Sequence, residues 1–551
     1  MSLNILVVAS EAFPMAKTGG LGDAVSGMAA AIAAAGSHVT LMLPAYPDAG
    51  RQVSGLKAVA KLNDLPGGSA TVLSGRCKTL GVPVLLLEHA TLYQRHGVYA
   101  DEQGVDYADN AIRFAALSQA AARVAQGLPG VSRPDVVHSH DWHTALTSLY
   151  MHQLGVVDVK TVLTLHNVAF QGVYPMSMAD ALGITPAYCT SQCLEFWGQL
   201  NFLKAGIQLA NKVTVVSRHY AREILTPQFG CGLEGVLADK GADLIAIPNG
   251  IDMATWNPAK DSHLHKYRYS VDKMANKAKC KRSLQASFGL QQDAQTMLLA
   301  MGSRLTSQKM ADVVVQVLPM VLDDHPKVQV AILGKGDKQI EAGLHEVASR
   351  YPGRCAVHIG YNEAQAHQLH AGADVLLHGS RFEPFGLTPL YAMRYGTVPI
   401  CSRVGGMVDT IIDPGWDDPN ADMSFATGLL FSGDAPADMS AAIDRAIALK
   451  ALPALWQLMQ RNGMSADFGW SHVAPLYVRC YHDLCATAAS NPLVETSTEV
   501  GRLGLARRDV NRMGAIATRV RGATSLALVP VAAPNRTALA VVRPTRGASL
   551  V

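Results

Sequence analysis

The sequence alternates twice between short apolar runs and helical segments, and this alternation limits the folds open to the chain. The first run, Asn4–Ser10, is rich in β-branched residues, as expected of a strand buried on both faces. A Gly-rich turn, an Ala-rich helical stretch from Asp23 to Ala35 and a second run, Val39–Leu43, complete one β-α-β unit. Further runs follow at residues 84–87, 136–137, 162–165 and 213–216. This pattern predicts a parallel, doubly wound α/β sheet.

A second series of runs begins after a Lys-rich stretch that ends near Lys281. Its members are residues 297–301, 328–333, 355–359, 375–377 and 398–401. We therefore expect two Rossmann-like domains, residues 1–252 and 262–465, with the boundary near residues 252–262. Because open parallel sheets bind ligands outside the carboxyl ends of their strands, two such domains facing each other predict a cleft between them.

Two further segments follow the second domain. Residues 466–486 include the amphipathic stretch Trp470–Leu484, which predicts a C-terminal helix that packs back on the first domain. Residues 490–551 carry nine arginines against three acidic residues without clear periodicity, and this predicts a flexible basic tail. The net charge of the whole chain is only +3, so bulk charge does not make its body a surface for nucleic acid.

The sequence also bears on the location of the protein. No stretch reaches the ~18 uninterrupted apolar residues that cross a bilayer, and the first nine residues lack the basic segment of an export signal. We therefore expect a cytoplasmic protein without a membrane or nucleic-acid partner. The nine cysteines show no Cys-x-x-Cys spacing and are predicted to be reduced thiols in the core.

The motif Lys17-Thr-Gly-Gly-Leu-Gly-Asp23 stands where the first strand turns into the first helix. Gly19 and Gly20 allow the backbone to approach a phosphate closely, and the N–H groups at a helix start attract anions. Lys17 adds a positive charge. An ordinary tight turn with a solvated lysine is the alternative. The motif is neither a Walker loop nor the dinucleotide-binding Gly-x-Gly-x-x-Gly pattern.

The string His138-Ser-His140-Asp141-Trp142-His143 follows another strand. Three histidines so close together suggest zinc, and a zinc hydrolase that uses His138, His140 and His143 is one alternative. The similar string of binuclear metallohydrolases, His-x-His-x-Asp-His, places its Asp one position later. A polar loop that binds sugar hydroxyls is the other interpretation. His166, after the run at 162–165, is either a second hydroxyl-binding group or a residue that caps the strand.

The segment Ser303–Lys309 directly follows the first strand of the second domain. It places Arg304 and Lys309 at the end of that strand, separated by small and polar residues. Two cations in this arrangement suit a diphosphate, because Arg offers a planar fork and Lys a point charge. A solvated loop is the alternative.

The segment Ser380–Pro389 places Glu383 before a Pro–Gly turn that leads into a helix. The N–H groups of Gly386, Leu387 and Thr388 then stand at the start of that helix, where they lack partners within it. A carboxylate and an anion site are therefore expected side by side. A surface glutamate with a capping turn is the alternative.

Together these segments resemble the bacterial glycogen synthase and plant starch synthase family, which comprises retaining glucosyltransferases of the GT-B fold. The resemblance runs from about Ile5 to Leu484. It is carried, in chain order, by Lys17-Thr-Gly-Gly-Leu, His140-Asp-Trp-His143, His166-Asn167 with Gln171-Gly172, Asn249-Gly-Ile-Asp252, Ser303–Lys309, Ala371-Gly-Ala-Asp374, Ser380-Arg-Phe-Glu-Pro384 and Gly386-Leu-Thr388. Three residues depart from the family pattern, namely Met310, Lys335 and Pro389, and they bear on donor affinity.

The resemblance implies ADP-glucose as donor, bound mainly to the second domain, and an α-1,4-glucan such as glycogen as acceptor; the choice between ADP- and UDP-glucose stays open. By this analogy the catalytic groups are Glu383 at the transferred glucose, Arg304 and Lys309 at the diphosphate, Lys17 at phosphate from the first domain, and Asp141 and His166 at sugar hydroxyls. The donor site would also contain Gly19, Gly20, Asp23, Asn249, Phe385, Gly386, Leu387 and Thr388.

The resemblance also implies a reaction without a metal or another cofactor. Fixed cations stabilise a leaving diphosphate directly, and the sequence holds no Asp-x-Asp, the motif of metal-dependent nucleotide-sugar enzymes. Another GT-B transferase that glycosylates a small acceptor is the alternative within the same fold.

Overall fold

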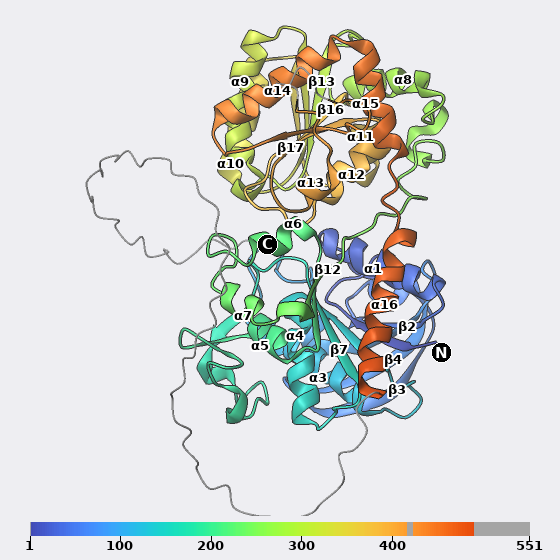
Figure 1. Cartoon of the computed structure of the whole chain (residues 1–551), viewed down its shortest axis with the longest axis vertical. Helices are drawn as coiled ribbons and strands as arrows, with labels where there is room; N and C mark the ends of the chain where they lie inside the picture. Colours follow the sequence, from blue (N-terminus) through green and yellow to red (C-terminus); the bar gives the residue numbers. More distant parts are fainter. Residues whose placement is uncertain (1, 416–421, 490–551) are drawn as a thin grey trace, which may run out of the picture.

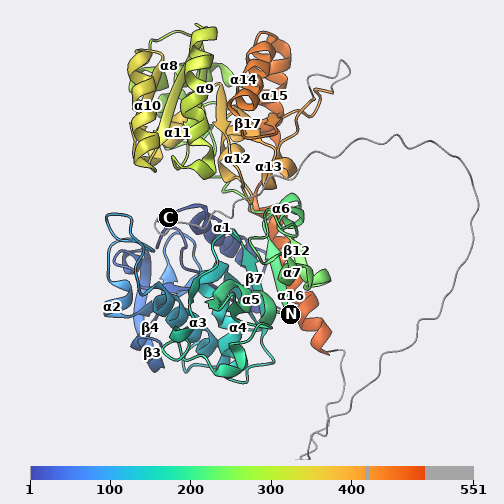
Figure 2. The same cartoon turned by 90° about the vertical axis from the view of Figure 1, so that its left-hand side faces the viewer.

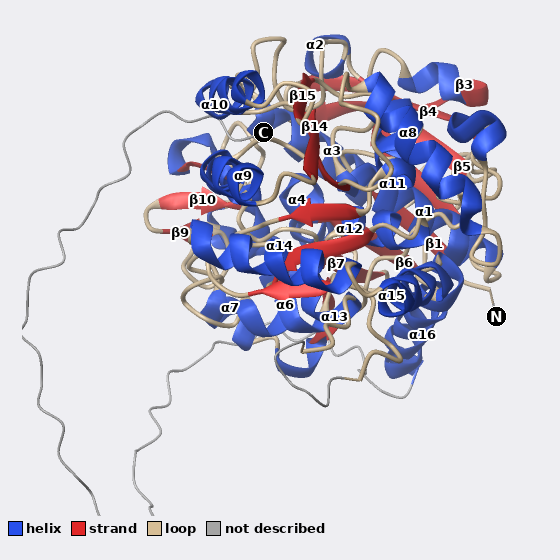
Figure 3. Ribbon diagram, turned by 90° about the horizontal axis from the view of Figure 1, so that it is seen from above, coloured by secondary structure: helices blue, strands red, loops and turns tan. Residues whose placement is uncertain are grey.

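The computed structural model describes residues 2–415 and 422–489; the predicted basic tail, residues 490–551, lies outside this part. Two α/β domains face each other along the long axis of the molecule (Figure 1). Seen from above, helices lie on both sides of the strands (Figure 3). The prediction of two doubly wound domains is confirmed, with one correction in the first sheet.

Nine strands form the first sheet within the described residues, in the order β12-β11-β7-β6-β1-β2-β5-β4-β3. From β12 to β5 all neighbours are parallel. The strands are β1 (Asn4–Val8), β2 (His38–Pro44), β3 (Val53–Leu65), β4 (Gly68–Cys77), β5 (Pro83–Glu88), β6 (Val136–His140), β7 (Lys160–Leu165), β11 (Lys212–Val215) and β12 (Leu244–Ala246). The order reverses between β1 and β6, which makes their carboxyl ends the expected ligand site.

The antiparallel hairpin of β3 and β4 was not predicted, and it corrects the expectation of a wholly parallel sheet. It forms the edge of the sheet, and most residues of β3 are exposed. An exposed edge strand needs no continuous apolar run, so the apolar pattern that reveals the buried strands is missing here.

Helices cover this sheet, and a small separate sheet, β8 (Val173–Pro175), β9 (Glu195–Phe196) and β10 (Gln199–Asn201), lies beside them. The helices are α1 (Gly20–Ala34), α2 (Ala90–Tyr93), α3 (Asn110–Gln126), α4 (Asp141–Gln153), α5 (Phe202–Leu209), α6 (Arg218–Glu223) and α7 (Glu234–Ala238). Helix α1 begins three residues before the expected Asp23.

The second sheet is parallel throughout, in the order β15-β14-β13-β16-β17-β18. Its strands are β13 (Met297–Gly302), β14 (Val328–Gly334), β15 (Cys355–Ile359), β16 (Val375–His378), β17 (Val398–Ser402) and β18 (Leu429–Phe431). The order is that of a Rossmann sheet, and its switch point lies between β13 and β16. Its helices are α8 (Lys277–Ser287), α9 (Ala311–Asp324), α10 (Lys338–Arg350), α11 (Glu363–Gly372), α12 (Leu387–Arg394), α13 (Gly405–Thr410), α14 (Pro436–Lys450) and α15 (Pro453–Ser465).

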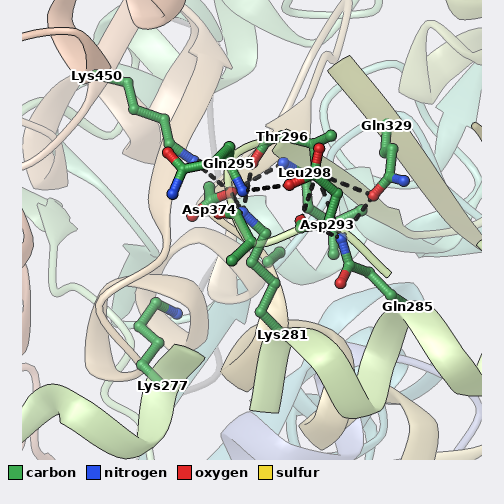
Figure 4. A network of polar contacts seen from close by, with 12 residues as sticks. Lys277, Lys281, Gln285, Asp293, Gln295, Thr296, Leu298, Gln329, Asp374 and Lys450 are labelled. Carbon is green, nitrogen blue, oxygen red and sulfur yellow. Dashed lines mark hydrogen bonds and ion pairs between the residues drawn. The ribbon is translucent and has the colours of Figure 1, made fainter. Parts of the chain in front are cut away.

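A buried ionic network joins the amino ends of β13 and β16 (Figure 4). Asp374 Oδ2 lies 2.7 Å from Lys281 Nζ and 2.5 Å from Lys450 Nζ, and it accepts the N–H of Leu298 at 2.9 Å. Burial alone would raise the pKa of Asp374, but Lys450 and Lys281 outweigh burial and hold it below its ordinary value. This network fixes the end of the sheet opposite the carboxyl ends, so the Asp374 motif has a structural role.

The last described helix, α16 (Trp470–Ala489), packs against α1 of the first domain (Figure 1). A Cβ on Gly27 would stand 2.0 Å from Trp470 Nε1, so only glycine admits the indole there. Within the described residues no helix is both long and apolar enough to cross a membrane. All nine cysteines are free, as predicted, but only six are buried in the core, since Cys189 and Cys485 are half-buried and Cys231 is exposed.

Candidate active site

Three of the predicted site residues of the first domain follow adjacent strands at the switch point of the sheet. Lys17 lies in the loop after β1, Asp141 directly follows β6, and His166 directly follows β7. The carboxyl ends of parallel strands meet at one edge. The first domain therefore gathers these residues at the edge that faces the second domain.

Asp141 holds the loop that contains His166. Its backbone has a φ of +55°, a conformation rare outside glycine, and its side chain is buried. Asp141 Oδ1 accepts the N–H groups of His166 at 2.7 Å and Asn167 at 3.3 Å. Burial raises the pKa of Asp141 to about 7, although these two hydrogen bonds oppose the rise. The Asp141 carboxyl group thus joins the ends of β6 and β7.

The histidine cluster is a packed hydrogen-bonded group. His138 Nδ1 lies 2.7 Å from the Tyr481 hydroxyl and His138 Nε2 lies 2.6 Å from Thr164 Oγ1, so both ring nitrogens are engaged. His140 Nδ1 contacts His166 Nε2 at 3.0 Å. Burial lowers the pKa of His166 to about 3, which keeps this ring neutral. Within the described residues no three His, Cys, Asp or Glu side chains are placed to hold a metal, which leaves the zinc-hydrolase alternative without a ligand set there.

The Gly-rich loop differs from expectation because a buried glutamate occupies part of it. Glu11 accepts the N–H groups of Thr18 and, at 3.2 Å, of Gly19, and it also accepts the Tyr99 hydroxyl at 2.5 Å. Two amide groups of the loop, including that of Gly19 near which a phosphate was expected, are therefore already bound. The remaining N–H groups of the turn belong to the first turn of α1, which begins at Gly20.

Lys17 forms an ion pair with Asp23 at 2.9 Å. Burial alone would lower the pKa of Lys17, but Asp23 and, from the second domain, Tyr361 and Glu363 raise it above its ordinary value. A Cβ on Gly20 would stand 3.3 Å from Leu387 Cδ1. The loop of Lys17 thus meets the second domain at the start of α12.

Lys309 and Glu383 form an ion pair at the switch point of the second sheet, where β13 and β16 end. Their side chains are only 13% and 12% exposed. Burial would raise the pKa of Glu383, but Lys309 and His378, whose Nε2 lies 3.4 Å from Glu383 Oε2, lower it well below its ordinary value. Glu383 therefore carries a negative charge that is held in place from two sides.

Several hydrogen bonds hold the segment that carries Lys309 against the segment that carries Glu383. Arg381 donates to both carboxylate oxygens of Asp312, each at 2.9 Å, and its backbone N–H donates to the carbonyl oxygen of Gln308 at 2.9 Å. The Gln308 amide accepts from Arg304 at 2.8 Å and donates to the Phe382 carbonyl oxygen at 3.3 Å. Arg304 and Lys309 are thereby positioned relative to Glu383.

The turn after Glu383 leads into α12 and lies against α13. Gly386 precedes α12 with a φ of +86°, so Leu387 and Thr388 form its first turn, as predicted. A Cβ on Gly406 would stand 2.4 Å from the carbonyl oxygen of Phe385. Glycine at this position therefore lets α13 pack directly on the turn.

The structure shows the backbone setting of the three departures from the family pattern. Met310 adopts a φ of +51°, a conformation typical of glycine, and its side chain is buried. Pro389 is the third residue of α12, where no intrahelical donor is required. The Lys335 carbonyl oxygen accepts the N–H of Leu305 at 3.0 Å.

The remaining predicted residue, Asn249, is buried after β12, where the chain leaves the first sheet. The sequence interpretation missed Glu11, His378 and the pair Tyr361 and Glu363. Glu11 and His378 are polar residues near the carboxyl ends of strands, and this is the only sequence feature that could have indicated a role for them in the site. A hollow of about 640 Å³ lies elsewhere, between η5 (Ser262–Tyr267) and α8, and contains none of the predicted residues.

Comparisons with known proteins point to one family. The family model for the starch synthase catalytic domain matches residues 4–239, and that for glycosyl transferases group 1 matches residues 285–461. The chain is 55% identical to a glycogen synthase of Bordetella petrii over 87% of this chain and 92% of that protein. It is 52% identical to a glycogen synthase of Ralstonia nicotianae over 89% of this chain and 90% of that protein.

Among solved structures, the catalytic domain of starch synthase IV from Arabidopsis thaliana, bound to ADP and acarbose, superposes with a TM-score of 0.80. Its identity is 28%, and the match covers 88% of this chain and all of that chain. A sucrose-phosphate synthase from Thermosynechococcus elongatus, 18% identical with a TM-score of 0.56 over 88% of this chain and all of that one, shares the fold. The chain therefore belongs to the glycogen synthase family of glycosyltransferases.

Proposed function

We propose that this protein transfers glucose from ADP-glucose to the non-reducing end of an α-1,4-glucan with retention of configuration, in the cytoplasm. The observation that carries the proposal is the buried Lys309–Glu383 pair at the switch point, with Arg304 held beside it through Gln308. The related starch synthase with bound ADP and acarbose supports an adenosine diphosphate donor and a glucan acceptor.

The site suits the charges that develop as the bond from the anomeric carbon to the diphosphate breaks. Negative charge grows on the phosphate oxygens, where Arg304 and Lys309 stabilise it. Positive charge grows on the anomeric carbon, where the Glu383 carboxylate stabilises it. The first-turn N–H groups of α12 favour the same anion. Since these groups are fixed in the fold, they need little reorganisation during the reaction.

The first domain contributes from the opposite side. Lys17 lies in the loop before α1, and α1 meets the start of α12 at Gly20 and Leu387, which supports a role for the Lys17 ammonium at the diphosphate. Asp141 and His166 follow β6 and β7 at the carboxyl ends of these strands, and we assign them to the acceptor side of the site. Because side chains supply the positive charge, we propose that the reaction proceeds without a metal and continues in the presence of a chelator.

A donor-competition assay tests this function. Purified protein is incubated with glycogen and either ADP-glucose or UDP-glucose, with and without EDTA, and the glucose incorporated into glycogen is measured. Incorporation from ADP-glucose that is faster than from UDP-glucose and insensitive to EDTA is expected. A wild-type protein that leaves glycogen unchanged, but transfers glucose to a small acceptor in a parallel incubation, would favour the alternative transferase.

A further inference from the structure

The two domains are joined by a pair of helices that bind each other reciprocally. Helix α6 belongs to the first domain and α13 to the second, and both views place them together at the junction (Figures 1 and 2). Glu223, at the end of α6, accepts the N–H of Gly405 at the start of α13, at 3.0 Å. Asp409, near the end of α13, accepts the N–H of His219 at the start of α6, also at 3.0 Å.

Each of these bonds satisfies an N–H group that the first turn of a helix leaves without an intrahelical partner. Both acceptors carry charge when ionised, and hydrogen bonds to charged groups are stronger than neutral ones. His219 Nε2 also lies 3.3 Å from Glu223 Oε1. The side chain of Glu223 is only 10% exposed, so water competes little for the contact.

The second-domain partner of Glu223 lies directly against the proposed catalytic turn. Gly405 has a φ of +48°, and a Cβ there would stand 1.7 Å from the carbonyl oxygen of Glu383. The next residue, Gly406, donates its N–H to the Pro384 carbonyl oxygen at 3.1 Å. One short path of contacts thus runs from Glu223 in the first domain through Gly405 to the backbone of Glu383.

We propose that Glu223 and Asp409 are positioning residues that hold α13 against the Glu383 turn when the two domains adopt this arrangement. Glu223 acts through Gly405, and Asp409 fixes the other end of the same helix to α6. The arrangement of the domains is thereby coupled to the position of the catalytic carboxylate. The inference rests on the proposed function, since its measurement is glucosyl transfer.

The chemistry of Glu223 provides a conservative variant. Glu223 Oε2 is buried and has no hydrogen-bond partner within the described residues. In Glu223→Gln the amide oxygen can still accept the Gly405 N–H while the NH₂ group takes the place of Oε2. In Glu223→Ala the acceptor is lost and the Gly405 N–H stays unpaired. The two variants therefore separate the hydrogen bond from the carboxylate charge.

The test compares kcat and KM for ADP-glucose and glycogen in Glu223→Ala, Asp409→Ala and Glu223→Gln. Asp239→Ala, at an exposed acid of the first domain, is the matched control. Loss of the buried Glu223 acceptor is expected to lower kcat about 10- to 100-fold, and loss of the exposed Asp409 acceptor about threefold to 10-fold, with KM for glycogen unchanged. We expect the kcat of Glu223→Gln to stay within about threefold of the wild-type value. Its melting temperature should equal that of the wild type.

The inference is overturned if either alanine variant has the kcat of Asp239→Ala, or if Glu223→Gln loses as much activity as Glu223→Ala. These results are distinct from a failure of the proposed function. If the wild type does not extend glycogen from ADP-glucose, the proposed function fails. If the wild type is active and Glu223→Ala is equally active, only the positioning role fails.

Discussion

Gly405 lies so close to Glu383 that a Cβ on Gly405 would stand 1.7 Å from the Glu383 carbonyl oxygen, although the two residues follow different strands. Gly405→Ala must therefore displace α13 or the Glu383 turn, and the φ of +48° adds strain. We expect glucosyl transfer to fall at least about 10-fold. Gly235→Ala, where a Cβ meets nothing within 4 Å, is the control in the same transfer assay. Equal activity of the two variants would show that the close approach does not matter.

Removing Lys309 should affect stability as well as activity. In Lys309→Ala the Glu383 carboxylate stays buried without its main partner, which costs about 3 kcal/mol or more of unfolding free energy. The double variant Lys309→Ala/Glu383→Gln removes the unpaired charge, so it should recover most of the stability but none of the activity. Urea denaturation and glucose transfer measure the two effects separately.

The exposed ion pair of Lys212 and Asp243 provides the control for this experiment. Because Asp243 is half exposed, Lys212→Ala should change the stability by less than about 1 kcal/mol and leave transfer unchanged. A double variant that is no more stable than Lys309→Ala would contradict the account of a buried unpaired charge.

The raised pKa of Asp141 makes stability depend on pH. The folded protein keeps the proton on Asp141 up to about pH 7, whereas the unfolded chain releases it near its ordinary pKa of 3.8. Between these values the folded state binds more protons, so this group lowers the free energy of unfolding as pH rises. Asp141→Asn cannot titrate. We expect its stability relative to the wild type to increase from pH 4 to pH 8 by up to about 4 kcal/mol.

Urea denaturation of both proteins at several pH values measures this difference. A gap between the two denaturation midpoints that stays constant from pH 4 to pH 8 would show that Asp141 ionises in the folded protein as it does in the unfolded chain.

The packing of α16 on α1 depends on the absence of a side chain at Gly27. In Gly27→Ala the new Cβ would overlap the Trp470 indole, which in this arrangement is 2.0 Å away at its nearest atom. Overpacking of this kind costs about 1–3 kcal/mol. We expect a melting temperature several degrees below that of the wild type and easier proteolysis of α16. Gly50→Ala, whose Cβ would make only an ordinary contact at 3.6 Å, should melt at the temperature of the wild type. If Gly27→Ala melts at the same temperature as Gly50→Ala, the prediction is contradicted.

The sequence predicts the buried strands and the strand-end residues well because both leave local signals. Lys309 and Glu383 lie in the loops that follow two apolar runs, and parallel strands bring their carboxyl ends together. The exposed β3–β4 hairpin leaves no apolar run. Glu11 resembles any polar residue after a strand until its contacts with Thr18 and Gly19 are seen.

The contact between Glu223 and Gly405 shows the other limit of sequence-based prediction. The two residues are 182 positions apart and belong to different domains. Periodicity and motif spacing describe neighbours along the chain, so they give no information on such a pair. Only the arrangement of the two domains brings Glu223 to the start of α13.

The proposed roles of Lys309 and Glu383 at the sugar donor are tested most directly by the rate of glucose incorporation into glycogen from ADP-glucose. The measurement compares the wild type with Lys309→Ala and Glu383→Ala, each confirmed as folded by its circular dichroism. We expect the wild type to extend glycogen and both variants to lose at least about 99% of its rate, since each removes a group that stabilises charge in the transition state. Folded variants that retain near-normal rates would contradict the proposed site.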